Sequence, residues 1–394
     1  MVFLCVGKEE VGLVSEYTGF LVVLASGLFF SELFKRLHIP YVVALIVAGI
    51  AIGPLGLGIV ELTPPILFLG SIGAVFLMFM AGMEVRTGAL SKFRKKLLVL
   101  VLMNGAVPGL VGFVVTLMFG YEPITSLIIG TVFVSSSVAV IIPTLEAKSL
   151  ISTDVGAVII GATILEDLGS LFFLSMVLQT TDPTTFLPLP IFIGIVAVSV
   201  FVLKNFLPRI EEWFFKNRDR EKFEQEFQFV LITTIAVAVY FEFLGMHAIV
   251  AGFLVGLILS GTIKHHRIES KLHAISYGVF IPIFFLEIGI ETDLTVFFSI
   301  NDALYLTVAI VGGLIASKLL SGYVAGRLIG FPKYTSLLIG GASIPQLSTS
   351  LAVAFTASEL GLLDARLQAS IVILSMVTVL LAPFIIELLT RDFK

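Results

Sequence analysis

The sequence predicts an all-α polytopic membrane protein of about 13 transmembrane helices with no soluble domain. Of its 394 residues, 58% are apolar and only 13% are charged, whereas a soluble domain carries about a quarter charged residues. The mean hydropathy is +1.09. Apolar runs of about 20 residues, the length that crosses a bilayer core, recur along the chain, and basic residues collect between alternate runs.

Charges, prolines and glycines divide the chain into candidate spans. The spans lie near residues 17–37, 41–60, 64–83, 97–119, 124–146, 151–178, 186–207, 228–246, 248–263, 275–291, 302–328, 334–357 and 365–388. The longest connection, 204–227, mixes both charge signs with aromatic residues. Such a mixture predicts an amphipathic helix at the membrane interface rather than a further domain.

The basic residues orient these spans. When the connections are numbered alternately, one set holds 21 of the 24 Lys and Arg residues, and the other holds only Lys8 and Arg366. Because cytoplasmic connections carry the excess of Lys and Arg, we expect a multi-pass protein of the cytoplasmic membrane. Its N-terminus is predicted outside and its C-terminus in the cytoplasm.

Composition also excludes several classes of partner. The net charge of -4, with no basic stripe, argues against nucleic acid. The single cysteine, Cys5, excludes an internal disulfide and a cysteine metal cluster.

His265, His266 and His273 share one connection, where a solvated loop is favoured over a pH sensor. No cofactor is predicted, and the expected partners are the lipid bilayer and transported ions.

Three ionisable side chains stand inside apolar spans. Glu166 and Asp167 lie near the middle of one span, and Lys318 lies near the middle of another. Such groups cost about 2.5–3.5 kcal/mol each at mid-membrane on insertion scales and are functional by default. Because consecutive helical residues diverge by about 100°, one acid can pair with Lys318 while the other faces a cavity.

The acid that faces the cavity can hold either a proton or a small cation. This competition is the minimal chemistry of proton-coupled exchange, whereas a purely structural ion pair leaves the second acid unexplained. Thr163 precedes Asp167 by four residues and shares its helix face. Its hydroxyl either contributes to the ion site or back-bonds to its own helix.

Two spans are interrupted by small hydroxyl residues and a proline. The span 124–146 contains three consecutive serines, 135–137, before Pro143, and the span 334–357 contains the run GGASIPQLSTS. Such segments can unwind at mid-membrane and present backbone groups to an ion. Because the two spans are an odd number of crossings apart, spans 4–6 and 11–13 are predicted to form an inverted repeat.

Other functions fit these residues less well. A cation channel would not place a lysine at mid-span and would show a repeated pore loop. A sodium-coupled organic-anion symporter on a similar fold would not need adjacent acids with a lysine partner. An intramembrane aspartyl protease needs carboxylates that converge from separate helices, so no enzyme is predicted. A potassium/proton antiporter or a potassium-efflux protein remains an alternative to a sodium/proton antiporter.

Several motifs, in order, resemble the monovalent cation:proton antiporter family over roughly residues 20–390. They are KRLHIPYVVALIVAGIAIGPLGLG, GAVFLMFMAGMEVRTGAL, VSSSVAVIIPTLEAK, the Glu-Asp pair, GMHAIVAGFLVGLILS and PIFFLEIGIETDL. The resemblance implies a homodimer that exchanges Na+, or else Li+ or K+, for protons by alternating access. It also implies a core, 64–178 and 275–388, and a dimerisation scaffold, 17–60 and 186–263.

The resemblance assigns roles to single residues. Asp167 matches the acid that coordinates Na+ or a proton, and Glu166 matches the first acidic position, with Lys318 as its charge partner. This combination is typical of the electrogenic branch. Ser136 and Ser137 match the polar positions of the broken helix beside the site.

The sequence departs from the family pattern at several positions. Glu166 stands where Asp is usual. Pro345-Gln346 replaces the Pro-Arg pattern of one branch, and Glu287 replaces a small or apolar residue. Glu287 either lines an outward funnel or extends to the outer interface. The sequence ends at Lys394, without the regulatory nucleotide-binding domain expected of potassium-efflux relatives.

Overall fold

The computed structural model describes residues 8–36, 39–83, 93–151, 153–181, 188–215, 223–246, 248–260, 266–299 and 301–390. Over these ranges the chain forms helices and connecting segments, with no strand. The elements are α1 (Lys8–Lys35), α2 (Tyr41–Ile52), α3 (Pro64–Met83), α5 (Arg94–Met118), α6 (Pro123–Val134), α7 (Val138–Ala147), α8 (Asp154–Thr181), α9 (Leu189–Phe215), α10 (Phe223–Phe243), α11 (Ala248–Leu259), α12 (His266–Ile275), the π-helix η1 (Ser276–Phe280), α13 (Ile281–Glu291), α14 (Val296–Ser299), α15 (Asn301–Leu328), α16 (Lys333–Ala342), α17 (Ser348–Glu359) and α18 (Ala365–Thr390). By length and composition, 8 described helices can cross a membrane, and shorter apolar helices accompany them. The predicted all-α membrane architecture is confirmed.

Both interrupted spans are pairs of short helices joined by a non-helical segment. α6 ends at Val134 and α7 begins at Val138, with Ser135 and Ser137 in extended conformation. α16 ends at Ala342, and α17 begins only at Ser348. The serines and the proline of these segments disfavour a continuous helix, because hydroxyls compete for backbone groups and proline lacks an N–H donor.

Three helix boundaries differ from the sequence prediction. α2 ends at Ile52 instead of reaching residue 60, because Gly53 and Pro54 stop it and the chain turns back onto the Ile52 carbonyl. α9 continues to Phe215, so residues 204–215 are not the separate interfacial helix that we expected. The span predicted over 275–291 belongs to a longer helical run from His266, with the π-helix η1 inside it.

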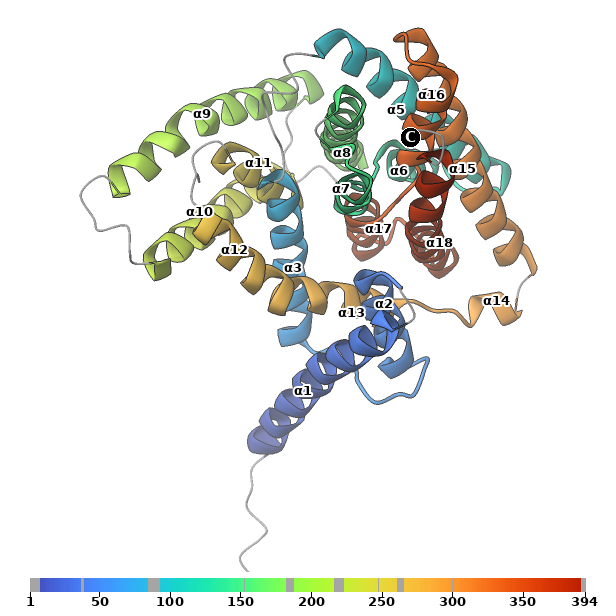
Figure 1. The fold of residues 1–394 in the computed structure, drawn as a ribbon. Helices are drawn as coiled ribbons and strands as arrows, with labels where there is room; N and C mark the ends of the chain where they lie inside the picture. The colour runs from blue at the N-terminus through green and yellow to red at the C-terminus, as the bar shows by residue number, and fades with distance from the viewer. Residues whose placement is uncertain are drawn as a thin grey trace, which may run out of the picture.

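The helices form two groups (Figure 1). The α3–α13 group comprises α1–α3 and α9–α13, in which α3 packs on α11 and α13, and α13 packs on α2. The α8–α15 group comprises α5–α8 and α15–α18, in which α15 packs on α5, α16 and α18. The two groups touch mainly where α17 meets α3 and α8 meets α9.

Glycines let helices within each group approach closely. A Cβ at Gly49 of α2 would lie 2.1 Å from the Leu286 carbonyl of α13, and one at Gly289 would lie 2.2 Å from the Ile46 carbonyl. In the other group, a Cβ at Gly322 of α15 would lie 2.4 Å from Gly340 of α16. Small residues at crossings are the usual way in which membrane helices gain van der Waals contact, so each group is tightly packed.

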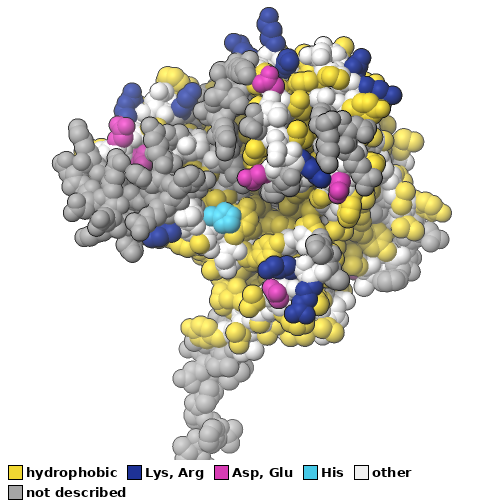
Figure 2. Space-filling view, viewed as in Figure 1, with side chains coloured by type: hydrophobic (Ala, Val, Ile, Leu, Met, Phe, Trp, Pro, Cys, Tyr) yellow, Lys and Arg dark blue, Asp and Glu magenta, His cyan; other side chains and the backbone are white. Residues whose placement is uncertain are grey.

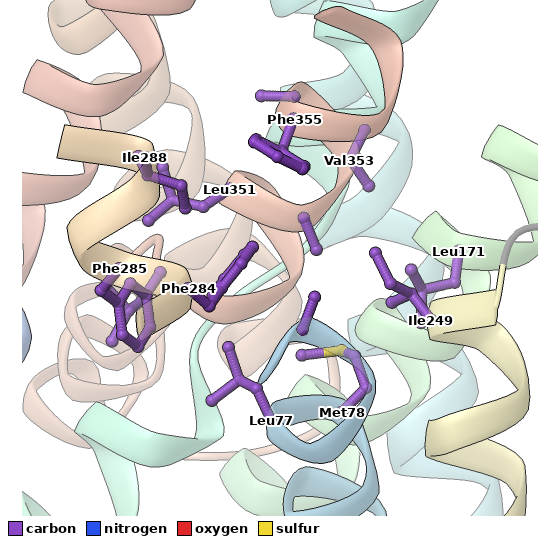
Figure 3. Packing of buried hydrophobic residues seen from close by; sticks show 14 of the residues in the cluster. Leu77, Met78, Leu171, Ile249, Phe284, Phe285, Ile288, Leu351, Val353 and Phe355 are labelled. Carbon is purple, nitrogen blue, oxygen red and sulfur yellow. The ribbon is translucent and has the colours of Figure 1, made fainter. Parts of the chain in front are cut away.

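An apolar seam separates the two groups (Figure 3). Its buried side chains come from α3, α11 and α13 on one side and from α8 and α17 on the other: Leu77, Met78, Ile249, Phe284, Phe285 and Ile288 against Leu171, Leu351, Val353 and Phe355. The rings of Phe284 and Phe355 meet edge to face across it, with centroids 5.9 Å apart. Figure 2 shows the surface hollowed at the centre of this face, with mainly hydrophobic side chains lining the hollow.

Candidate functional site

The two adjacent acids of α8 lie deep in the α8–α15 group. Glu166 and Asp167 stand near the middle of the helix, and each is only 1% exposed. Their side chains leave α8 in directions about 100° apart, so they meet different surroundings. The structure brings Lys318 to Glu166; the prediction that the other acid faces a cavity stays a prediction.

Glu166 is fully engaged by its neighbours. Its Oε2 accepts from the Lys318 ammonium at 3.0 Å and from the Ser136 hydroxyl at 2.8 Å. Its Oε1 accepts from Nδ2 of Asn104 at 2.9 Å. A buried carboxylate is tolerated when it is paired and hydrogen-bonded in this way, and these donors leave Glu166 little capacity for a further ion.

Lys318 is buried completely, and carbonyl oxygens complete the set of acceptors around its ammonium group. Besides Glu166, its Nζ donates to the Val134 carbonyl at 2.8 Å, to Ser136 Oγ at 3.0 Å and to the Asn104 carbonyl at 3.2 Å. Both carbonyls are free because the sequence removes the backbone N–H donor that would otherwise bond to each of them. Val134 is the last residue of α6, and Pro108, four residues after Asn104 in α5, has no N–H to donate to it.

Asp167 has the opposite character. Its Oδ1 accepts a long hydrogen bond, 3.3 Å, from the Ser136 backbone N–H. Among the described residues, its Oδ2 has no hydrogen-bond partner although it is buried. The Thr349 hydroxyl of α17 faces the same carboxylate. An unpaired buried carboxylate oxygen is costly, so a proton or a cation bound at this atom would stabilise the site.

The two helix breaks cross beside these acids and bind each other. The Ser137 backbone N–H donates to the Pro345 carbonyl at 2.8 Å. Gln346 donates from Nε2 to the Ser135 carbonyl at 2.7 Å and accepts from the Ser135 hydroxyl at 3.0 Å. Some backbone groups freed by one break are thus satisfied by the other, while Lys318 bonds to the Val134 carbonyl and Thr378 accepts from the Gln346 N–H, as non-helical backbone at membrane depth requires.

The remaining predicted residues take different positions. The Ser136 hydroxyl lies in the centre of the site, whereas the Ser137 hydroxyl has no partner among the described residues. Thr163 donates to the Ile159 carbonyl at 3.0 Å, so the back-bonding alternative is the one observed. Glu287 lies on α13, outside the acid pair, and is 1% exposed. The alternative in which it extends to the interface is therefore wrong.

Two groups at the site were missed by the sequence reasoning. Asn104 links Glu166, Lys318 and Ser321, whose hydroxyl donates to Asn104 Oδ1 at 2.9 Å. Thr349 faces Asp167 from the second break. A signal for Asn104 does exist, since an amide in an apolar span is followed by a proline four residues later. Its partners, however, come from helices distant in sequence.

Of the three histidines predicted to share a solvated loop, the structure describes the side chain of one, His273. His273 is exposed on α12, and its ring stacks on Tyr277 with centroids 4.2 Å apart. This part of the predicted solvated loop is therefore helical. His265 and the side chain of His266 lie outside the described part of the chain.

Comparisons with known proteins cover almost the whole chain. The family model described as "Sodium/hydrogen exchanger, transmembrane" matches residues 20–391. A probable Na+/H+ antiporter 3 of Methanocaldococcus jannaschii is 32% identical over 383 residues, which are 95% of this chain and 96% of that protein. The Na+/H+-K+ antiporter GerN of Bacillus cereus is 27% identical and covers 92% of this chain and 93% of its own.

A solved structure shares the fold. The sodium proton antiporter MjNhaP1 of Methanocaldococcus jannaschii superposes with a TM-score of 0.72 over 96% of this chain and 98% of that chain, at 16% identity. At this identity the likeness shows the shared fold alone.

Proposed function

The chain belongs to the sodium/hydrogen exchanger family, and from this premise we propose that it is a secondary antiporter that exchanges Na+ for H+. The ions cross a membrane by alternating access and compete for Asp167, while Glu166 and Lys318 form the charge pair beside it. The names of its relatives support Na+ as the exchanged cation. The family is one of membrane transporters.

One observation carries this proposal: of two adjacent buried acids, only one has a free oxygen. Glu166 accepts hydrogen bonds on both carboxylate oxygens, whereas Oδ2 of Asp167 has none from the described residues. A single negative charge in a low-dielectric site can be neutralised by one proton or by one Na+, but not by both. Binding of either ion therefore displaces the other.

The surrounding oxygens supply further ligands for a cation. Ser136 in the first break and Thr349 in the first turn of α17 both face Asp167. We propose the Thr349 hydroxyl as a Na+ ligand, because oxygen ligands suit a hard cation. The Ser136 hydroxyl is occupied by Glu166 and Lys318, so its role is to hold that pair in place. Thr163 bonds to its own helix, whereas the Ser137 hydroxyl has no partner among the described residues and stays a proposed auxiliary ligand.

Alternating access needs a part that moves and a part that stays. We propose the α8–α15 group as the moving core, since it carries the acids and both breaks, and the α3–α13 group as the scaffold. This division moves α3 and α13 out of the core inferred from sequence, because their packing is with α2 and α11. Apolar contacts along the seam support sliding, since they do not depend on one geometry.

The remaining features of this proposal concern the whole assembly. The excess of Lys and Arg in one set of connections supports an outer N-terminus and a cytoplasmic C-terminus. We also propose a homodimer in which the scaffold forms the contact. Cysteine accessibility from each side of the membrane tests the orientation, and native mass spectrometry in detergent tests the dimer.

Purified protein in liposomes tests the exchange itself. With an acid interior, external Na+ should drive proton efflux in the wild type, and Asp167→Asn should abolish it, because an amide cannot exchange a proton for a cation. Asp154→Asn is the matched control, since Asp154 is exposed at the start of the same helix. Parallel additions of Li+, K+ and choline identify the cation.

Two outcomes would contradict the proposal. The first is Na+ flux that moves no protons at any pH, which would favour a symporter. The second is full exchange by Asp167→Asn, which would place the ion elsewhere.

A further inference from the structure

Glu287 is a second buried acid that the proposed exchange does not use. It lies on α13 in the α3–α13 group and is 1% exposed. Its Oε2 has no hydrogen-bond partner among the described residues. We propose that Glu287 is a second proton-binding site of this antiporter, which takes up and releases protons at the seam between the two groups. The proposal rests on the exchange function above and deepens it.

The carboxyl group of Glu287 occupies a notch in α3. A Cβ at Gly70 would lie 1.6 Å from Glu287 Oε2 and 2.6 Å from its carboxyl carbon. The absence of a side chain at Gly70 therefore creates the space that holds the acid. Neither α3 nor α2, both of which pack on α13, offers a charged side chain.

The charged groups near Glu287 are themselves acids. Glu291, one helical turn further along α13, and Glu359, at the end of α17, both repel its negative charge. On α1, which meets α13 where Gly27 touches Leu286, Glu32 and Lys35 lie one to two turns beyond the contact. The π-helix η1 has no charged residue. No described cation therefore faces Glu287 to stabilise its ionised form.

The position of Glu287 fits a proton path rather than a fixed structural role. Gly70 and Met78 lie eight residues apart on α3, a rise of about 12 Å. Met78 reaches the Asp167 site, where Thr349 Oγ1 lies 3.9 Å from its sulfur atom. Glu359 approaches Glu287 from the other group. Relative sliding of the two groups would change the distance between Glu359 and Glu287. The repulsion between the two acids, and therefore the proton affinity of Glu287, would change with it.

The chemistry follows from charge. A carboxyl group in an apolar notch next to two acids is neutral when it holds a proton, and its ionised form has no partner. A cation would need further oxygen ligands of the kind that Ser136 and Thr349 offer at Asp167, and among the described residues no hydrogen-bonding group contacts Glu287 Oε2. The exchangeable species is therefore the proton.

Infrared difference spectroscopy tests proton binding without any transport. A step from acid to alkaline pH should remove the C=O stretch of a protonated carboxyl in the wild type, and Glu287→Gln should lack that contribution. Glu242→Gln is the matched control, because Glu242 is exposed near the end of α10. If Glu287→Gln and the wild type give the same carboxyl bands, Glu287 exchanges no proton and the inference is overturned.

The pH profile of exchange gives a second, independent readout. The neutral amide of Glu287→Gln removes a negative charge at alkaline pH, so the midpoint of Na+-driven proton efflux should move about one pH unit lower. Gly70→Ala should also alter the profile, because it displaces the carboxyl from its notch. An unchanged profile in both variants, with normal yield and thermal stability, would overturn the inference while leaving exchange at Asp167 intact.

Discussion

Two neighbouring residues on α8 differ because one has a counter-charge and the other does not. Glu166 and Lys318 neutralise each other at 3.0 Å inside a shell of hydrogen bonds. Asp167, one position further, is left with an unpaired oxygen. Similar depth in two spans and the angular separation of adjacent helical residues predicted that one acid pairs with Lys318, and the family resemblance assigned that role to Glu166.

The Glu166–Lys318 pair should be coupled in stability. Lys318→Gln leaves a buried carboxylate without a counter-charge, which costs about 3–5 kcal/mol. The double variant Glu166→Gln/Lys318→Gln should lose much less than the sum of the two single variants. Thermal unfolding in detergent measures all three, and strictly additive losses would show that the two charges do not act as a pair.

Asn104 should be needed to hold this pair. Asn104→Ala removes one donor to Glu166 and leaves the Ser321 hydroxyl only the more distant Lys318 carbonyl, at 3.3 Å, as its acceptor. We expect a loss of about 1–3 kcal/mol and a weaker apparent affinity for Na+. Asn205→Ala is the control, because Asn205 is half-buried on α9 and, among the described residues, its side chain bonds to its own helix at the Phe201 carbonyl. Equal behaviour of the two variants would remove Asn104 from the site.

The role of Asn104 could not be predicted from sequence, and the reason is physical. An asparagine in an apolar span commonly packs helices together. Its function here depends on Glu166 and Lys318, 62 and 214 residues away in the chain. Local pattern contains no information on which distant side chains converge, whereas the charges themselves could be recognised because isolated charges are rare in membranes.

At the scale of helices, the two breaks are the features that sequence predicts best. Serines 135–137 in one span and the run GGASIPQLSTS in the other disfavour continuous helix locally, so both interruptions could be located without knowledge of the fold, whereas Pro143 lies inside α7. The ends of α2 and α9 were less predictable. Apolar composition continues past Ile52, where glycines stop the helix, and charged residues after 203 do not prevent α9 from continuing to Phe215.

One contact joins the connection between α5 and α6 to the connection between α17 and α18. The Tyr121 hydroxyl donates to the Asp364 carboxylate at 3.1 Å, and Asp364 also caps α18 through the Leu367 N–H at 2.9 Å. Burial, the Asp364 charge and this hydrogen bond raise the pKa of Tyr121 to about 12, against a small opposing effect of Arg366. The hydrogen bond from Tyr121 to Asp364 is intact while the Tyr121 hydroxyl keeps its proton.

This pKa gives a prediction for alkaline pH. Because the folded pKa of Tyr121 lies above its ordinary value of 10.0, the folded state binds the proton more tightly than the unfolded state. Its contribution to stability is complete below pH 10 and is lost as pH rises towards 12. In Tyr121→Phe, the stability of the protein should fall less steeply between pH 10 and pH 12 than in the wild type. Unfolding midpoints measured through this range test it, and parallel curves for both proteins would contradict it.

At the scale of the whole molecule, the apolar seam separates two tightly packed groups. Within each group, glycines bring backbones together, whereas the seam is formed by larger side chains such as Phe284 and Phe355. Membrane interfaces made of interlocked backbones resist sliding more than interfaces made of flexible apolar side chains. The division into two groups could not be derived from sequence, because apolar residues line both kinds of contact.

A cross-link across the seam should stop exchange. Phe284→Cys/Phe355→Cys in a Cys5→Ser background places thiols on α13 and α17, where the native rings are 5.9 Å apart. A short thiol-specific linker with a cleavable disulfide should abolish Na+-driven proton movement, and reductant should restore it. The two single-cysteine variants are controls. Full activity of the cross-linked protein would mean that the two groups do not move at this point.

The carbonyls around Lys318 have a consequence for the electric field across the membrane. Because its ammonium bonds to α5, α6 and α8 at once, the positive charge of Lys318 and the negative charge of Glu166 move together with their helices. Their charges cancel, and Asp167 is neutral with either Na+ or H+. A cycle that swaps these ions at Asp167 alone therefore displaces no net charge, and the membrane potential does no work on it. Voltage can drive the protein only through a proton that binds elsewhere or through deprotonation of Lys318.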